Sequence, residues 1–195
     1  MTPEELKEKK DTFIRRYNIE RTHQRATQAG IVAASQHNSL YRYGLPPDAK
    51  VPVREYWENR LNEIAAKYAS PVGVSEYEED IQSLKQTMNA LFADRFRSDR
   101  HPRFGYDPGF RISHAQKSLS VCLKHLWCMG EIETPPPQCP VDSVILRAVG
   151  LSYPQTRWAC VNSIDEHRKR IDALSRYADR AGLKLAEWEL VTFLA

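Results

Sequence analysis

The sequence has little that would tie the chain to a membrane. Its longest run of small apolar residues, 29–34, has six members, whereas a helix that spans a bilayer needs about 20 apolar residues. The first eight residues, MTPEELKE, include several charged side chains and no apolar signal segment. We therefore expect a cytoplasmic protein that has no membrane partner.

Paired cysteines are also missing, because the four cysteines form no C-x-x-C pair. Structural zinc sites and iron–sulfur clusters use closely spaced ligands of that kind, so the sequence predicts free thiols and no cofactor. One zinc site stays open as an alternative. His125 and Cys128 would share a helix face, and Cys139 could supply a third ligand.

Strand patterns are nearly absent, whereas helix signals recur along the chain. Thr2 is a typical N-cap followed by a proline, and Ser75, Ser113 and Ser163 each stand three residues before a Glu or Gln. We expect helices at about residues 3–17, 21–40, 54–69, 75–95, 113–129, 163–181 and 186–193 and a short one from 142, with loops at 43–52, 97–109 and 131–140. The sequence thus predicts an all-α fold of about eight helices. Residues 1–195 form one helical domain, which could divide into subdomains at about 1–94 and 95–195 on either side of a cleft.

Positive charge is concentrated in one segment. Residues 95–125 carry seven Lys or Arg against two Asp, a net charge of +5, so the rest of the chain carries −2 of the total of +3. Aromatic side chains stand among these cations, which is typical of a surface that follows phosphates and stacks on bases. The aromatics are Phe96, Phe104, Tyr106 and Phe110. A solvated arginine-rich loop would show the same composition and stays open as an alternative.

Lys117 is the first candidate for chemistry. It stands one turn into the helix expected at 113–129, where the positive end of the helix dipole disfavours an ammonium group and favours the neutral amine. A neutral lysine amine is a nucleophile that can form a Schiff base. The face that carries Lys117, Val121 and Lys124 lies opposite the apolar stripe of this helix, so it would line a cleft or face solvent.

Asp142 is the second candidate. It precedes the apolar run 144–146 and is therefore expected to be the N-cap of a short helix. The helix dipole and the amide donors would keep its carboxylate ionised. An ionised carboxylate beside a sugar can stabilise an oxocarbenium-like transition state, so capping and catalysis are compatible at this position.

These residues together resemble the helix-hairpin-helix DNA glycosylases, and within them the 8-oxoguanine DNA glycosylase branch. The resemblance lies in Lys117 near the start of its helix, the apolar stretch 119–126, a proline-rich loop and Pro140-Val141-Asp142, and it covers about residues 107–146. It implies that Lys117 is the nucleophile and that Asp142 stabilises positive charge at the sugar C1′. It also implies that the partner is double-stranded DNA with an oxidised or otherwise modified purine, that no cofactor is needed, and that strand cleavage by β-elimination can follow base release. We expect a monomer. The missing hairpin glycines and the unmatched N-terminal half suggest an unusual substrate, for example a hypermodified base of viral DNA.

The chain departs from that family at the hairpin. The family's Gly-x-Gly turn before the lysine is missing, since only Gly109 stands nearby. We therefore expect a degenerate hairpin in which Arg111, Ser113 and free helix amides hold a phosphate. The further expected DNA contacts are Arg95, Arg97, Arg100, Arg103 and Lys124. The expected base-pocket or wedge residues are the aromatics Phe110, Trp127, Tyr153 and Trp158, with His114 and His125 as groups that could transfer a proton.

Other functions fit parts of the same sequence. A non-catalytic helical DNA-binding module would use the basic segment 95–124 and would give salt-sensitive binding without a covalent product. A protein-interaction subunit would place that segment against an acidic partner, and a zinc-dependent protein would bind stoichiometric metal. The residues and the resemblance favour the DNA glycosylase, whose excised base the sequence does not specify.

Overall fold

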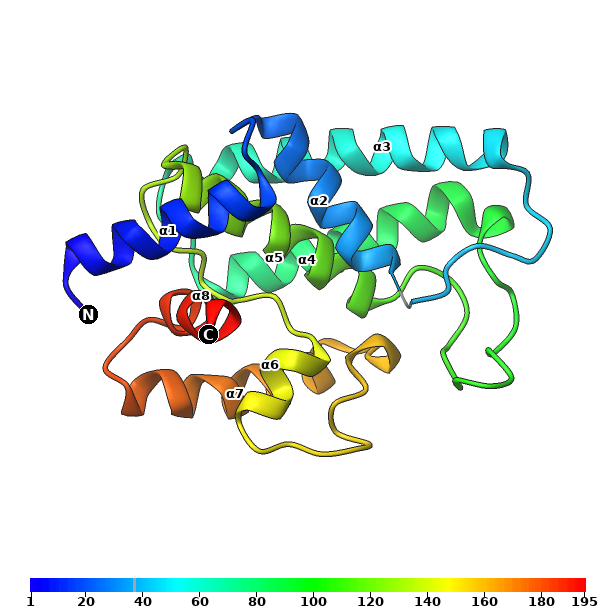
Figure 1. Cartoon of the computed structure of the whole chain (residues 1–195). Coiled ribbons are helices and arrows are strands. Elements are labelled where there is room, and N and C mark those ends of the chain that lie inside the picture. The colour runs from blue at the N-terminus through cyan, green and yellow to red at the C-terminus, as the bar shows by residue number, and fades with distance from the viewer. Residues whose placement is uncertain (37) are drawn as a thin grey trace.

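The computed structural model describes residues 1–36 and 38–195, and it confirms the prediction of an all-α fold of about eight helices (Figure 1). The α-helices are α1 (Pro3–Tyr17), α2 (His23–Ser35), α3 (Pro47–Ala66), α4 (Val74–Phe92), α5 (Ile112–Met129), α6 (Ser143–Ala148), α7 (Ile164–Arg180) and α8 (Leu185–Leu194). Three short 3-10 helices are η1 (Lys67–Ala69), η2 (Ala93–Arg95) and η3 (Trp158–Cys160). Within the described residues, the strand-like pairing is confined to one isolated bridge between Tyr41 and Phe96.

Three of the predicted helix starts are confirmed. The Thr2 hydroxyl accepts a hydrogen bond from the Glu5 N–H, and the Glu5 carboxylate accepts one from the Thr2 N–H. Asp142 and Ser163 cap α6 and α7 through their side-chain oxygens. Each cap supplies an acceptor to N–H groups that have no partner within the helix.

Two predicted caps are wrong, because Ser75 and Ser113 stand inside α4 and α5. Ser113 is fully buried, and its hydroxyl donates to the carbonyl of Ala159 at 3.1 Å, so it is not free to cap a helix. At the start of α5 the cap comes from His114 instead, whose Nδ1 accepts the N–H of Arg111 at 3.1 Å. The side chain at the third helical position thus satisfies the N–H of the N-cap residue, and the Ser113 N–H in the first turn donates to the Val161 carbonyl at 2.9 Å.

The second and third helices also differ from the predicted ranges. α2 ends at Ser35 rather than near residue 40, and α3 begins at Pro47 rather than near residue 54. Proline is well tolerated at the first helical position, so Pro47 starts α3 where a loop was expected. Pro52 lies inside the helix, where its missing N–H costs one backbone hydrogen bond. Burial of Val53 and of the residues one and two turns after it holds the helix together through this region.

α5 runs through the centre of the molecule, and α2 crosses it at very short range (Figure 1). The crossing point on α2 is Gly30, where an added Cβ would lie 2.3 Å from the carbonyl oxygen of Ser118. Ala26 and Ala34 are buried on the same face of α2. Small residues therefore let α2 approach the α5 backbone, and this places α2 as one wall of the pocket described below.

Replacing Gly30 with alanine is expected to destabilise the protein by about 1–3 kcal/mol, because the methyl group must displace backbone rather than a flexible side chain. The gain in helix propensity, about 1 kcal/mol, offsets only part of this cost. Urea unfolding followed by circular dichroism measures the change. Gly73→Ala is the control for available space, since a Cβ there meets nothing within 4 Å; its own cost is the weaker N-cap that alanine gives α4. Equal stability of the two variants would show that the α2–α5 crossing tolerates a side chain.

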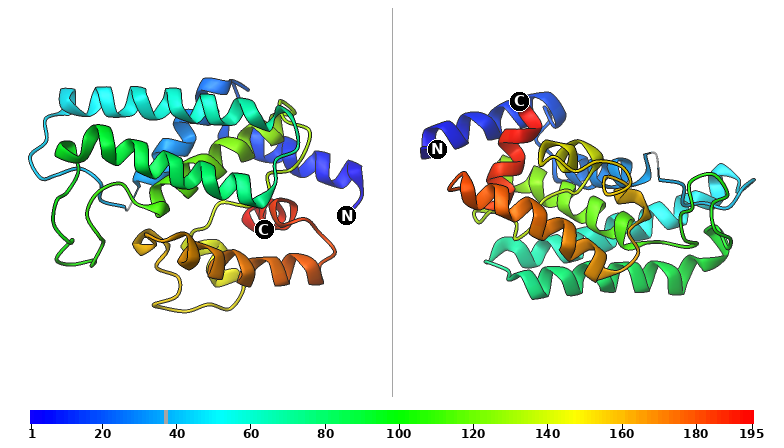
Figure 2. Two further views of the ribbon diagram at one scale, coloured as in Figure 1. Left: turned by 180° about the vertical axis from the view of Figure 1, so that it is seen from behind. Right: turned by 90° about the horizontal axis from the view of Figure 1, so that it is seen from below.

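The core consists of two buried clusters, and α8 contacts both. The larger cluster surrounds α5 with side chains from α1 to α4, and the smaller one joins α6, α7 and α8. On α8, Leu190 belongs to the first cluster and Trp188 to the second, and the helix lies against α1 and α7 (Figure 2). The larger cluster contains residues from both sides of position 94, and the smaller one draws on residues between Cys139 and Trp188.

Three buried histidines are expected to make the fold sensitive to acid. Burial lowers the pKa of His114 well below its usual value, and burial together with nearby cations lowers the pKa of His125 and of His167 to about 4. Because these pKa values are depressed in the folded state, the stabilisation is fully present above about pH 6.5 and is lost as the pH falls toward 4. The loss is about 3 kcal/mol for each of His125 and His167.

This acid sensitivity can be measured as the free energy of unfolding in urea between pH 7.5 and pH 4. His167→Gln removes one titrating group whose Nε2 bonds the Gln138 side chain at 2.7 Å, so the pH slope of this variant should be visibly shallower. A free energy of unfolding that stays constant over this range in the wild type would contradict the prediction.

Candidate active-site pocket

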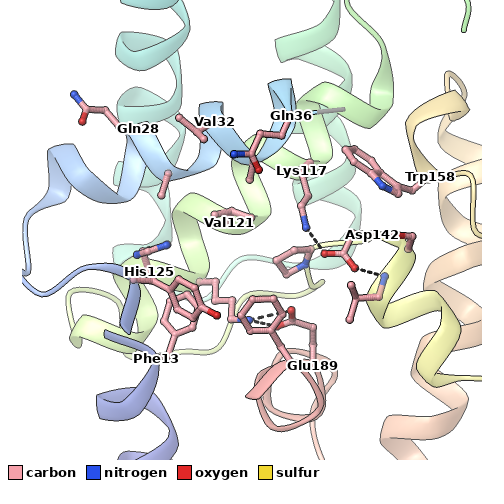
Figure 3. Close-up of a pocket in the computed structure, with 18 of the residues that line it drawn as sticks. Phe13, Gln28, Val32, Gln36, Lys117, Val121, His125, Asp142, Trp158 and Glu189 are labelled. Atoms are coloured by element: carbon pink, nitrogen blue, oxygen red, sulfur yellow. Dashed lines mark hydrogen bonds and ion pairs between the residues drawn. The ribbon is translucent and has the colours of Figure 1, made fainter. Parts of the chain in front are cut away.

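A pocket of about 530 Å³ opens between the two buried clusters (Figure 3). α2 forms one wall, α5 forms the floor, and the opposite wall is the N-terminus of α6 with η3; α1 and α8 close one end. The side chains that line it are Phe13, Tyr17, Arg25, Gln28, Ala29, Val32, Ala33, Gln36, Lys117, Val121, Lys124, His125, Pro140, Asp142, Ser143, Val144, Trp158, Glu189 and Phe193. The α5 face that was expected to line a cleft or face solvent therefore lines a cleft.

Lys117 and Asp142 meet in this pocket, as the sequence suggested. The distance from Lys117 Nζ to Asp142 Oδ2 is 2.8 Å, and both side chains are largely buried. The other carboxylate oxygen, Oδ1, accepts the N–H groups of Val144 and Ile145 at 2.9 and 3.0 Å. One oxygen thus anchors the carboxylate to the start of α6, and the other faces the amine (Figure 3).

The residues next to this pair hold its two halves together. The side-chain amide of Gln116 donates to the Val141 carbonyl at 3.1 Å, and its oxygen accepts the Val141 N–H at 3.3 Å. Gln116 precedes Lys117 and Val141 precedes Asp142 in the chain. A buried two-point contact therefore fixes the start of α6 against α5 directly beside the ion pair.

The electrostatics of the pair favour an ionised carboxylate. Burial alone would raise the pKa of the Asp142 carboxyl, but the Lys117 ammonium and the amides of Val144 and Ile145 together lower it below its usual value. The carboxylate therefore stays negatively charged at neutral pH and presents a fixed charge to the pocket.

Trp158 is the one expected aromatic that lines the pocket. Lys117 Nζ lies 5.9 Å from the centre of its ring, so the indole borders the ion pair (Figure 3). The structure corrects the other pocket assignments. Phe110 packs against Trp57 in the core, and Trp127 is covered by Lys10, at 4.0 Å from Nζ to the ring centre. Neither ring lines the pocket, because each lies on the core side of the helix or loop that carries it.

His114 and Tyr153 also differ from their expected roles. His114 is fully buried outside the pocket, where it caps α5 and lies 5.1 Å from the Phe110 ring, centre to centre. Its Nδ1 accepts a hydrogen bond, so the neutral ring carries its proton on Nε2, which faces the Asn38 carbonyl at 3.3 Å. Tyr153 is 75% exposed and does not line the pocket.

The far end of the pocket holds a buried ion pair that the sequence did not predict. Lys124 Nζ lies 2.9 Å from Glu189 Oε1 and 2.7 Å from Oε2. The rings of Phe13 and Phe193 surround the ammonium, with their centres at 4.7 and 4.1 Å. Lys124 was expected to contact DNA phosphates, but its ammonium is committed to Glu189, and its side chain is only 6% exposed.

His125 stands beside this ion pair and lines the pocket. Its ring packs edge-on against Phe13, and its Nδ1 is buried without a hydrogen-bond partner among the described residues. The low pKa of its imidazole, about 4, comes from burial and from Lys124 and Arg25. His125 thus borders the pocket, whereas His114 does not line it.

Two more of the expected phosphate contacts lie in the core. The guanidinium of Arg111 is buried and bonds the Asp107 carbonyl at 2.7 Å, the Ser39 carbonyl at 3.0 Å and the Asn38 side chain. Ser113 is fully buried. A phosphate cannot reach either group without displacing these contacts, so both are structural in this conformation.

The remaining basic residues of the segment lie on its outer surface, away from the pocket. Arg100 and Arg103 are exposed on the loop between η2 and α5, and Arg95 and Arg97 are partly exposed. Arg95 bonds the Ala49 carbonyl at 2.8 Å and Arg97 pairs with Asp99 at 3.0 Å. These four cations stay candidates for contact with a nucleic acid, and none lines the pocket of Lys117.

The described residues contain no group of three or more His, Cys, Asp or Glu side chains placed to hold a metal ion. The alternative zinc site at His125, Cys128 and Cys139 therefore finds no support, and all four cysteines are free. None of the helices in the described part of the chain is both long and apolar enough to cross a membrane.

Comparison of the chain with protein-family models, with curated proteins and with solved structures gives no significant match. The function must therefore be argued from the site itself.

Proposed function

We propose that the protein is a DNA glycosylase of the helix-hairpin-helix type with a degenerate hairpin. The observation that carries this proposal is the ion pair of Lys117 and Asp142, 2.8 Å apart, at the side of a pocket with aromatic walls. Both residues were proposed from the sequence as nucleophile and charge stabiliser, 25 residues apart. To act on the same sugar, the nucleophile and the charge stabiliser must lie close together, and these two side chains are in contact.

The chemistry assigns one task to each group. Lys117 Nζ forms a bond to the sugar C1′ while the bond from C1′ to the base nitrogen breaks, and the bonding electron pair leaves with the base. The proton that the ammonium loses goes to the departing base. The anchored Asp142 carboxylate stabilises the positive charge that develops at C1′. The resulting lysine adduct can open to a Schiff base, from which β-elimination would cleave the strand.

The rest of the pocket suits a base that has left the helix stack. An enzyme that acts on C1′ must receive the flipped base between apolar or aromatic faces and read its polar edge. Trp158 borders the ion pair, and Phe13 and Phe193 stand at the far end. Between them, the polar side chains that could read a base are Gln28 and Gln36. We propose a modified base, oxidised or hypermodified, as the substrate.

The test needs no knowledge of that base. Duplex DNA with a preformed abasic site is mixed with the protein and borohydride, which reduces a Schiff base to a stable covalent bond. We expect a protein–DNA adduct, and peptide mass spectrometry should place it on Lys117. An adduct on another lysine would remove Lys117 from the mechanism.

A second candidate, a non-catalytic DNA-binding module, is favoured by the loop between η2 and α5. There Phe104 is 41% exposed and stacks on Tyr106 with ring centres 5.4 Å apart, and the Arg103 guanidinium lies 5.2 Å from the Phe104 ring centre. Such a cation–aromatic cluster suits contact with unpaired bases. Under this alternative the protein binds DNA in a salt-dependent way, and borohydride traps nothing.

A further inference from the structure

A second hollow, of about 490 Å³, lies at the C-terminal end of α2 and is rich in cations. We call it the basic groove. Three of its lining side chains, Arg42, Lys50 and Arg97, are cationic, and no Asp or Glu of the described chain lines it. The remaining lining residues are Ser35, Asn38, Ser39, Leu40, Tyr41, Tyr43, Gly44, Leu45 and His101. A hollow with this charge is complementary to an anion.

The groove is assembled from segments far apart in the sequence. Around the bridge of Tyr41 and Phe96, the N–H of Arg42 donates to the Arg95 carbonyl at 3.1 Å, and the N–H of Arg97 donates to the Leu40 carbonyl at 3.0 Å. These backbone contacts fix the chain before α3 to the chain after η2. They therefore place Arg42 and Arg97 at one site, where both side chains line the groove.

The buried Arg111 bonds two of the residues that line the groove. Its guanidinium bonds the Ser39 carbonyl and the Asn38 side chain, both of which belong to the lining. The arginine that the sequence assigned to a phosphate thus acts as a positioning residue for the segment that carries Arg42.

The cations of the groove have unused bonding capacity. Arg97 Nη2 pairs with Asp99, whose side chain is 69% exposed, so solvent screens this ion pair. Lys50 lies over the Tyr41 ring, with Nζ 5.3 Å from its centre. Neither Lys50 nor Arg42 forms an ion pair with any residue of ranges 1–36 and 38–195. Unpaired guanidinium and ammonium donors around a hollow are what a phosphate requires.

The groove and the pocket of Lys117 share the C-terminal end of α2. Ser35 at the end of α2 lines the groove, and the next residue, Gln36, lines the pocket. We propose that the basic groove binds backbone phosphates of the DNA strand whose base enters the pocket, with Arg42, Lys50 and Arg97 as the contacts. This inference rests on the proposed function, and it replaces Arg111 and Ser113 as the phosphate anchor.

The test measures wild-type binding to a duplex that carries a tetrahydrofuran abasic analogue, on which no Schiff base can form. Binding is followed by fluorescence anisotropy from 50 to 200 mM salt. For the double variant Arg42→Gln/Lys50→Gln, two lost phosphate contacts should reduce the salt slope of log K by about 2 and weaken binding at 50 mM by on the order of 100-fold. The matched control, Arg176→Gln/Lys169→Gln, removes the same charges from the exposed surface of α7 and should keep the wild-type slope.

The outcomes separate this inference from the proposed function. If the wild type forms the borohydride adduct but the double variant keeps the wild-type slope, the groove assignment is wrong and the glycosylase proposal stands. If the wild type neither binds DNA nor forms the adduct, both fail. If inorganic phosphate at constant ionic strength raises the thermal midpoint of the wild type but not of the double variant, while the DNA slope is unchanged, the groove holds free phosphate and not DNA.

Discussion

Replacing Lys117 with glutamine is expected to abolish the covalent adduct with abasic DNA and to slow base release by on the order of a thousandfold or more. The amide cannot attack C1′ or form a Schiff base, and the loss of a group that acts directly in the transition state has effects of this size. Asp142 keeps its two amide donors in the variant but loses its counter-charge, so we expect α6 to stay capped and the fold to persist at a lower free energy of unfolding. Borohydride trapping, single-turnover base release and circular dichroism together measure the three quantities.

Asp142→Asn is the partner variant that separates the roles of the two groups. Asparagine caps helices about as well as aspartate, so the variant should fold with α6 intact. It lacks the charge that stabilises C1′, so base release should fall, whereas trapping on a preformed abasic aldehyde should continue because that step forms no oxocarbenium ion. Full adduct formation by Lys117→Gln, or unchanged base release by Asp142→Asn, would contradict the proposed division of work.

Glu189→Gln is expected to lower the free energy of unfolding by about 3–5 kcal/mol, because it leaves the Lys124 ammonium buried without a counter-charge. Burial raises the pKa of the Glu189 carboxyl, and the Lys124 charge acts against this rise, so each charge depends on the other. The double variant Lys124→Met/Glu189→Leu should recover most of the stability, since Phe13 and Phe193 already offer an apolar surround. Urea unfolding of both variants gives the comparison.

An exposed ion pair serves as the control for this prediction. Arg60 and Glu63 lie 2.8 Å apart on α3, with the glutamate side chain 65% exposed, so Glu63→Gln should change stability by less than about 1 kcal/mol. A similarly small effect of Glu189→Gln would mean that the Lys124 ammonium finds water or another partner in the pocket.

The all-α fold and the cap at Asp142 could be predicted because they depend on local signals, whereas the joint action of Lys117 and Asp142 was expected only from the family resemblance. Helix periodicity can be recognised from residues close together in the sequence, and Asp142 is a good N-cap that precedes an apolar run. The prediction of a loop around Pro52 was wrong because long-range contacts, and not local signals, decide the structure there. Burial of Val53 and Trp57 against distant helices outweighed the local preference of proline to end a helix.

The rest of the site could not be predicted from the sequence, because the charge of a side chain does not show whether it faces solvent or is buried. Arg111, Ser113 and Lys124 belong to the basic segment, yet each is directed into the protein, where a specific acceptor or donor compensates its burial. Phe13 and Glu189 lie near opposite ends of the chain, and only the packing of α1 against α8 brings them to one pocket. No local sequence pattern can predict a contact between residues so far apart in the chain.

The two-point contact of Gln116 with the Val141 backbone has a consequence for mobility. A hinge between the two buried clusters would have to pass between α5 and α6, where this amide holds both the N–H and the carbonyl of one residue. This contact therefore holds the Lys117 amine and the Asp142 carboxylate at their separation of 2.8 Å. Under the proposed function, the energy of DNA binding would then go to extruding the base, because none of it would be needed to bring the reacting groups together.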